Sequence, residues 1–374
     1  MISGLPDFPW DSLAPFTERA SAVSGGIVDL SIGTPVDPTP AVVQQALRDA
    51  ADAPGYPQTH GSPDLREAVA TWFATRRGVP DVDPAGVLPT IGSKELVAWL
   101  PTMLGLGPGD IVGIPTVAYP TYDVGVRLAG AVPYAADATT AYGPLTSATT
   151  PKLLWLNTPG NPTGKVLGVP HLAKVVAWAR RHGIVVASDE CYAELDWRTD
   201  RDGETAPTTP SILDPRVTGG SHEGLLAVYS LSKQSNLAGY RAAFVAGDPA
   251  IVAGLLEVRR HAGMIVPWPV QRAMLAALGD TAHVAEQKAR YAARRATLAA
   301  AVTAYGLRIE ESQAGLYLWS TAGEDCWTTV GRLADLGILV APGVFYGRAA
   351  SQHVRIALTA TDERIAAAAQ RLVA

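Results

Sequence analysis

The chain has 374 residues, of which 48% are hydrophobic and 17% charged, and its formal net charge is −5 at pH 7. At ~150 residues per domain, this length predicts two or three domains, each able to bury a substantial core. The slightly acidic balance argues against a nucleic-acid groove or a surface for anionic membranes, and no apolar run approaches the ~18 residues of a membrane span.

The cysteines and histidines give no sign of a disulfide framework or a metal site. Cys191 and Cys326 are the only cysteines and lie far apart in sequence, so reduced thiols are expected. The seven histidines show no metal-ligand spacing. The opening stretch MISGLPDFPWDSL has neither the basic nor the apolar region of a signal peptide. We therefore expect a cytoplasmic protein without a metal.

The first 30 residues are punctuated by prolines and predict an irregular arm. Helical and strand patterns then alternate from about residue 39 to residue 306. Pro101 predicts a kink or an early end in one of the helices. The ranges with helical periodicity are 41–52, 64–77, 94–104 and 170–182.

Short apolar runs lie between these helices. Several are rich in Val, Ile and Leu without alternation, as expected of strands that are covered on both faces. The alternation of strands and helices predicts an α/β fold with a mostly parallel sheet between two layers of helices. The predicted strands are 110–114, 152–156, 184–188, 225–230 and 242–246.

The pattern changes after a long predicted helix at 281–305, which Gly306 would end. The remaining elements predict a smaller α+β domain. We expect a large domain over 35–280 and a small domain that combines 1–34 with 281–374. A Thr- and Asp-rich stretch, 196–214, is expected to be an exposed loop. The predicted C-terminal elements are strands at 307–311, 315–320, 338–341 and 353–358, and helices at 326–336 and 362–373.

Polar residues follow three of the predicted strands directly. Asn157 follows the second, Asp189 follows the third, and Lys233 lies just beyond the fourth. Ligands of open α/β sheets bind outside the carboxyl ends of the strands. The sequence therefore predicts a site at these three strand ends, provided that the strands are neighbours.

Lys233 and Asp189 each allow two interpretations. Lys233 is one of only six lysines and follows a buried strand. It is either a solvated loop residue or a partly desolvated amine, whose lowered pKa would make it a nucleophile. Asp189 either caps the turn that follows it or holds a positive charge within the site.

The glycine-rich segments do not match two common nucleotide-binding motifs. Residues 160–165 do not fit GxxxxGK, because position 159 is proline, and Gly105, Gly107 and Gly109 do not fit GxGxxG. The Gly92-Ser93-Lys94 sequence at a predicted helix start is a better anion site, since free N–H groups and the helix dipole favour phosphate there.

Four ordered motifs resemble those of the class I/II aminotransferases, the pyridoxal-phosphate enzymes of fold type I. They are NPTG at 161–164, SDECY at 188–192, SLSKQSNLAGYR at 230–241 and HVRIAL at 353–358. The resemblance extends along nearly the whole chain. It implies a large domain with a mostly parallel seven-stranded sheet between helices, a smaller α+β domain, and pyridoxal 5′-phosphate as cofactor.

The resemblance also assigns catalytic roles. Lys233 would bind the cofactor covalently and then move the proton at the substrate Cα. Asp189 would hold the protonated pyridine nitrogen, which keeps the ring an electron sink. Tyr192 and Asn161 would hydrogen-bond the ring's 3-oxygen, and Tyr119 would stack on the ring.

Further residues are implied to bind the phosphate and the substrate. Arg355 would grip the substrate α-carboxylate, with Gly33 lining the same end. Tyr56 would reach the phosphate of a neighbouring subunit, which implies a homodimer with shared sites. The residues expected to bind the phosphate within the subunit are Ser93, Lys94, Ser230 and Arg241.

Local similarity narrows the expected substrate. Residues 5–16, 29–40, 53–69 and 259–271 resemble actinobacterial N-succinyldiaminopimelate aminotransferases of lysine and cell-wall biosynthesis. The implied reaction transfers an amino group between L-glutamate and N-succinyl-2-amino-6-oxopimelate. That substrate carries several carboxylates, so a second site cation is expected. The candidates are Lys94, Arg259 and Arg260.

Three other functions stay open at this point. The chain could be another transaminase, acting on aspartate, aromatic or LL-diaminopimelate substrates. It could catalyse a different pyridoxal-phosphate reaction, such as C–S β-elimination, because a fold does not dictate one reaction. It could also be a cofactor-binding regulator without turnover, although the acidic balance and the lack of a DNA-binding extension argue against this.

Overall fold

A computed structural model describes residues 5–143, 145, 146, 148–199 and 209–374. Seven strands form one sheet in the order β2-β8-β7-β6-β5-β3-β4, in which only β8 runs antiparallel to its neighbours. This sheet confirms the predicted α/β fold, and each of the five predicted strands is present to within one residue. The strands are β2 (Val87–Ile91), β3 (Ile111–Ile114), β4 (Val132–Ala135), β5 (Leu153–Asn157), β6 (Val185–Asp189), β7 (Leu225–Ser230) and β8 (Ala242–Gly247).

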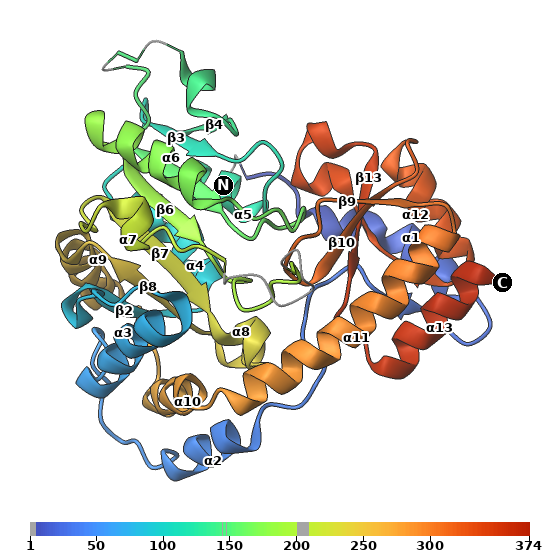
Figure 1. Ribbon diagram of the computed structural model, residues 1–374, viewed down its shortest axis with the longest axis horizontal. Coiled ribbons are helices and arrows are strands. Elements are labelled where there is room, and N and C mark those ends of the chain that lie inside the picture. Colours follow the sequence, from blue (N-terminus) through green and yellow to red (C-terminus); the bar gives the residue numbers. More distant parts are fainter. Residues whose placement is uncertain (1–4, 144, 147, 200–208) are drawn as a thin grey trace.

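Helices cover both faces of this sheet (Figure 1). The residues of β5 alternate between two hydrophobic clusters, because successive side chains of a strand point to opposite faces. Leu154 and Leu156 pack with α2, α3, α6, α7 and α10, whereas Leu153 and Trp155 pack with α4, α5 and α9. The helices are α2 (Ala41–Asp49), α3 (Pro63–Arg77), α4 (Ser93–Met103), α5 (Thr121–Leu128), α6 (Val169–Arg181), α7 (Pro215–Thr218), α8 (Leu231–Gln234), α9 (Pro249–Ala262) and α10 (Trp268–Gly279).

The long helix α11 (Ala282–Ala304) leads from the large sheet to a smaller α+β region, on the right in Figure 1. A four-stranded sheet, β12-β13-β10-β9, forms its centre. Strand β1 pairs in parallel with β11, so the N-terminal segment joins the C-terminal region. The elements are α1 (Ala14–Ser21), β1 (Val28–Asp29), β9 (Arg308–Glu310), β10 (Tyr317–Thr321), α12 (Cys326–Asp335), β11 (Ile338–Leu339), β12 (Ala341–Pro342), β13 (His353–Ala357) and α13 (Asp362–Val373).

The structure corrects three expectations from the sequence in whole or in part. The N-terminal arm is not irregular, because α1 lies within it and Pro15 occupies the first turn of that helix, where proline is tolerated. Pro101 allowed a kink or an early end of its helix, and the early end is excluded because α4 continues to Met103. The stretch 196–214 is not an exposed loop throughout: residues 211–213 are buried, while residues 200–208 lie outside the described part of the chain.

The remaining secondary structure consists of short 3₁₀ turns. Within the described residues, no helix is both long and apolar enough to cross a membrane. Both cysteines are buried free thiols, as predicted. The 3₁₀ turns are η1 (Pro9–Leu13), η2 (Pro84–Gly86), η3 (Thr139–Tyr142), η4 (Ala238–Tyr240), η5 (Gly343–Tyr346) and η6 (Arg348–Ala350).

Candidate active site

The predicted polar residues lie together at the carboxyl ends of the central strands of the large sheet, because β5, β6 and β7 are adjacent. Asn157 lies opposite Asp189 in the register of β5 and β6. A cavity of about 790 Å³ opens at these strand ends. It is lined by every predicted site residue except Tyr56. These residues are Gly33, Ser93, Lys94, Tyr119, Asn161, Asp189, Tyr192, Ser230, Lys233, Arg241 and Arg355.

Asp189 ends β6 as a buried carboxylate. Its Oδ1 accepts a hydrogen bond from the Cys191 backbone N–H at 3.2 Å, and its Oδ2 accepts one from the Tyr122 hydroxyl at 2.8 Å. Burial raises the pKa of Asp189 despite these two donors. The carboxylate therefore caps its own turn and also lines the cavity, where a bound cation would stabilise its ionised form.

Lys233 lies in the short helix α8, directly after β7. The Ser230 hydroxyl caps this helix by accepting a hydrogen bond from the Ser232 N–H at 3.2 Å. The Lys233 Nζ donates to the Gly33 carbonyl oxygen. Burial lowers the pKa of the Lys233 amine, with Arg355 and Arg241 adding to the effect. This environment favours the desolvated amine over the solvated loop lysine.

Arg355 on β13 is a buried guanidinium, only 3% exposed. Its Nη2 donates to the Ser31 carbonyl oxygen at 2.6 Å, and its Nη1 donates to the Asn161 Oδ1 at 3.0 Å. Its Nε has no partner, and no carboxylate of the described residues pairs with it. Because a buried cation without a counter-charge is costly, this arrangement fits a carboxylate ligand.

The start of α4 forms an anion cradle together with Arg241. Gly92 precedes this helix with a φ of 74°, and a Cβ at that position would lie 2.1 Å from the Arg241 Nη2. Glycine therefore lets the guanidinium approach the free N–H groups of the first turn. Ser230 and Ser232 line the same cavity.

The structure adds several residues that sequence reasoning missed. Tyr122 donates to Asp189, and Tyr317 lies 3.1 Å from Tyr192, hydroxyl to hydroxyl. The segment 5–10 also lines the cavity, where the Phe8 ring centroid lies 5.9 Å from the Lys94 Nζ. The sequence offers a signal only for Tyr122, which lies one helical turn beyond the predicted ring-stacking tyrosine.

Two of the three candidates for a second substrate cation do not line the cavity. Arg259 is fully buried, and its Nη1 contacts the Glu95 Oε1 at 2.8 Å. Arg260 forms an exposed pair with Glu257 at 2.7 Å. Only Lys94 lines the cavity, and it forms no ion pair within the described ranges.

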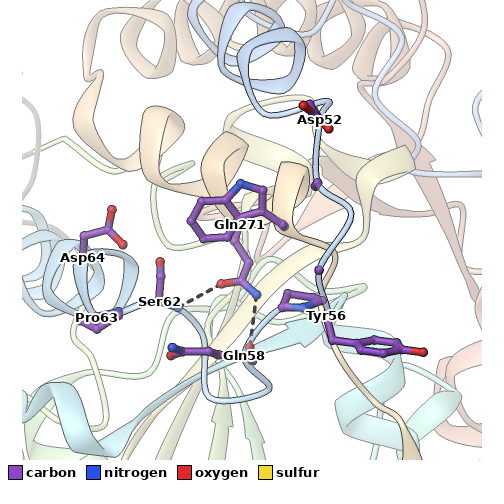
Figure 2. Close-up of a pocket in the computed structure, with 11 residues that line it drawn as sticks. Asp52, Tyr56, Gln58, Ser62, Pro63, Asp64 and Gln271 are labelled. Atoms are coloured by element: carbon purple, nitrogen blue, oxygen red, sulfur yellow. Dashed lines mark hydrogen bonds between the residues drawn. The ribbon is translucent and has the colours of Figure 1, made fainter.

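Tyr56 lies apart from this cavity. Its side chain is 99% exposed and stands at the edge of a second hollow of about 530 Å³. In Figure 2 its ring points away from Gln271, which accepts a hydrogen bond from the Ser62 N–H at 3.0 Å and donates one to the Gln58 carbonyl oxygen at 3.3 Å. Tyr56 is therefore free to contact another molecule.

Comparisons with known proteins identify the family. Residues 26–372 match the model of "Aminotransferase class I and II". The chain is 57% identical over 369 residues to 4-dedimethylamino-4-oxo-anhydrotetracycline transaminase OxyQ of Streptomyces rimosus, covering 98% of this chain and 99% of that one. It is also 57% identical over 370 residues to "Probable aminotransferase Rv1178" of Mycobacterium tuberculosis, covering 99% and 86%.

A solved structure supports the same assignment. The probable N-succinyldiaminopimelate aminotransferase of Thermus thermophilus superposes with a TM-score of 0.84 at 29% identity, covering 98% of this chain and 99% of that one. The protein therefore belongs to the class I and II aminotransferases. It is a pyridoxal-phosphate-dependent transaminase of fold type I that acts on amino acids and 2-oxo acids.

The residues present fit this cofactor. Asp189 offers a buried carboxylate for the ring N–H, and Lys233 offers an amine of lowered pKa. The space at Gly92, which a Cβ would fill, lets Arg241 and the start of α4 face a phosphate together. When bound, the cofactor supplies an electron sink for the bonds of the substrate Cα.

Proposed function

We propose that the protein transfers an amino group between L-glutamate and N-succinyl-2-amino-6-oxopimelate, giving N-succinyl-LL-diaminopimelate in lysine biosynthesis. Four cations line the large cavity, and none has a carboxylate partner in the described part of the chain. The observation that carries this proposal is that Arg355 and Lys94 remain for substrate carboxylates once Lys233 and Arg241 are assigned to the cofactor. Arg355 would bind the α-carboxylate and Lys94 a distal carboxylate. The similarity to the probable N-succinyldiaminopimelate aminotransferase of Thermus thermophilus supports the same substrate.

Each side chain of the site has a role in this proposal. Lys233 holds the cofactor and moves the proton at the substrate Cα, acting as an amine whose lowered pKa suits proton transfer. Asp189 keeps the ring nitrogen protonated. Asn161 and Tyr192 donate to the ring oxygen, and Tyr119 stacks on the ring.

The phosphate would be held by the first turn of α4 (Ser93 and Lys94, mainly through their N–H groups), Ser230 and Arg241. We also propose a homodimer in which Tyr56 reaches the partner's phosphate, which its nearly complete exposure supports. Light scattering would give the mass of a dimer. Tyr56→Phe would weaken cofactor binding without changing that mass.

The domain boundaries and the cellular location are part of the proposal. Residues 35–280 would form the large domain, and 1–34 with 281–374 the small one. A reducing, cytoplasmic compartment agrees with the two free thiols.

A second substrate is favoured by the apolar side chains around Lys94. The cavity is also lined by Leu5, Phe8, Trp10 and Ile32. A polycyclic ketone, such as the oxo-anhydrotetracycline in the name of the 57% identical Streptomyces relative, would bury its rings against such a surface.

Half-reactions separate these substrates. The cofactor-loaded protein is mixed with N-succinyl-LL-diaminopimelate, and loss of the cofactor's visible absorbance band reports amino transfer. We expect conversion, and L-glutamate should convert the same protein. An unchanged band with the succinylated substrate, together with reaction of the amine form with the oxo-anhydrotetracycline, would replace the first proposal by the second. Pyruvate or ammonia release without a 2-oxo acid would indicate β-elimination.

Lys94 provides a sharper test of substrate selection. Lys94→Gln removes the charge but retains the backbone N–H of the helix start. We expect KM for N-succinyl-LL-diaminopimelate to rise about tenfold, the typical effect of removing a charge-assisted hydrogen bond, while cofactor affinity is unchanged. Arg260→Gln is the matched control, because it removes a surface cation outside the cavity. Equal KM values in both variants would contradict the role of Lys94.

A further inference from the structure

A buried tyrosine of the small sheet lies near two of the cations of the site, Arg355 and Lys233. Tyr317 is the first residue of β10, is 4% exposed and lines the cavity. The centroid of its ring lies 4.0 Å from the Arg355 Cζ, which is nearer than any other aromatic ring in the described residues. This contact holds the guanidinium against an aromatic face.

The Tyr317 hydroxyl and the Lys233 amine both lie beside Gly33. A Cβ at Gly33 would lie 2.1 Å from this hydroxyl oxygen, so only glycine leaves room for it. The carbonyl oxygen of the same Gly33 accepts the hydrogen bond from the Lys233 Nζ. The Tyr192 hydroxyl lies 3.1 Å from the Tyr317 hydroxyl. The Tyr317 phenol and the Lys233 amine therefore both lie against Gly33.

Charge links these groups as well. Burial alone would raise the pKa of the Tyr317 hydroxyl, but Arg355, Lys233 and the hydrogen bond with Tyr192 together outweigh burial and lower it. In return, burial lowers the pKa of Lys233 and Tyr317 opposes that shift. The protonation states of the phenol and the amine thus depend on each other.

We propose that Tyr317 is a positioning residue for the amino transfer. Its ring fixes the Arg355 guanidinium for the substrate carboxylate, and its hydroxyl fixes the Lys233 amine beside Gly33. This inference rests on the roles proposed above for Lys233 and Arg355. The strand of Tyr317, β10, pairs with β13, which carries Arg355. The tyrosine thus connects the carboxylate-binding Arg355 to the proton-transferring Lys233.

Two substitutions separate the ring from the hydroxyl. Tyr317→Phe retains the ring, so the dissociation constant of glutarate, an unreactive dicarboxylate, should stay within about twofold while kcat falls about tenfold through misplacement of Lys233. Tyr317→Leu removes the ring, so the glutarate dissociation constant should rise about fivefold to thirtyfold. Tyr291→Phe is the control, because it removes a buried phenol that does not line the cavity. It should change neither quantity by more than about twofold.

The outcomes separate failure of the role of Tyr317 from failure of the proposed function. An unchanged kcat in Tyr317→Phe overturns the role of the hydroxyl, and an unchanged glutarate affinity in Tyr317→Leu overturns the role of the ring. If Tyr317→Leu fails to fold in a circular dichroism melt, Tyr317→Phe still decides the role of the hydroxyl, because it removes a single oxygen atom. The proposed function itself fails by other results: no reaction of the wild-type protein with glutamate or with N-succinyl-LL-diaminopimelate, or full activity in Lys233→Ala.

Discussion

Removal of the Arg355 side chain tests the carboxylate site most directly. In Arg355→Ala, the hydrogen bonds to the Ser31 carbonyl oxygen and the Asn161 Oδ1 are lost, and the substrate carboxylate has no buried cation to meet. Truncating one partner of a buried, hydrogen-bonded charge pair costs about 2–5 kcal/mol. At about 1.36 kcal/mol per tenfold change, kcat/KM for glutamate should fall about 30-fold to 5,000-fold.

The assay is the half-reaction of cofactor-loaded protein with glutamate, followed by absorbance over a range of concentrations. A matched donor is 4-aminobutyrate, which is glutamate without the α-carboxylate. Arg355→Ala should leave the slow rate with this donor nearly unchanged, because it has no group for Arg355 to bind. Arg260→Ala controls for the loss of an arginine elsewhere. An unchanged KM for glutamate, or an equal loss with both donors, would refute the assignment.

Two further predictions concern protonation. Tyr122→Phe removes the hydrogen-bond donor to the Asp189 Oδ2. Because a hydrogen bond to a charged group contributes about 1.5–3 kcal/mol, the cofactor-free variant should bind pyridoxal phosphate at least tenfold more weakly than the wild type. An absorbance titration measures this affinity, and an unchanged value would contradict the prediction. Burial opposes ionisation of Asp37, but hydrogen bonds from Arg294 and Gln287 lower the pKa of its carboxyl below the ordinary value. Its contribution to stability is therefore present above the unfolded-state pKa and is lost as pH falls through the folded-state value. Between about pH 5 and pH 2 the wild type should lose more unfolding free energy in urea than Asp37→Asn, and parallel curves would count against the pair.

The large sheet and the site at the carboxyl ends of its strands could be predicted, because the sequence patterns that mark them are local. Continuous apolar runs mark β5, β6 and β7, and polar residues follow each run directly. The edge strand β4 gave no such signal, since three of its four residues are exposed. The helix α1 was missed because its prolines were interpreted as breaks, although Pro15 lies in the first turn.

The aromatic residues around Arg355 could not be predicted in the same way. Tyr317 and Trp10 are ordinary aromatic residues in their local sequence, and only the folded chain brings them to Arg355. The failure of Arg259 as a substrate cation has the same origin. Its partner Glu95 is 164 residues away in sequence, and no local sequence pattern predicts that pair.

The contact between Arg355 and Ser31 has a consequence for the biosynthesis of the protein. The two residues are separated by 324 positions, whereas β6, which ends at Asp189, and β7, which directly precedes the helix of Lys233, are neighbours both in sequence and in the sheet. Every residue between Ser31 and Arg355 must be synthesised before the two can meet. Nascent chains that already contain the lysine therefore cannot yet capture an amino acid by its carboxylate, which delays substrate recognition until translation has passed β13.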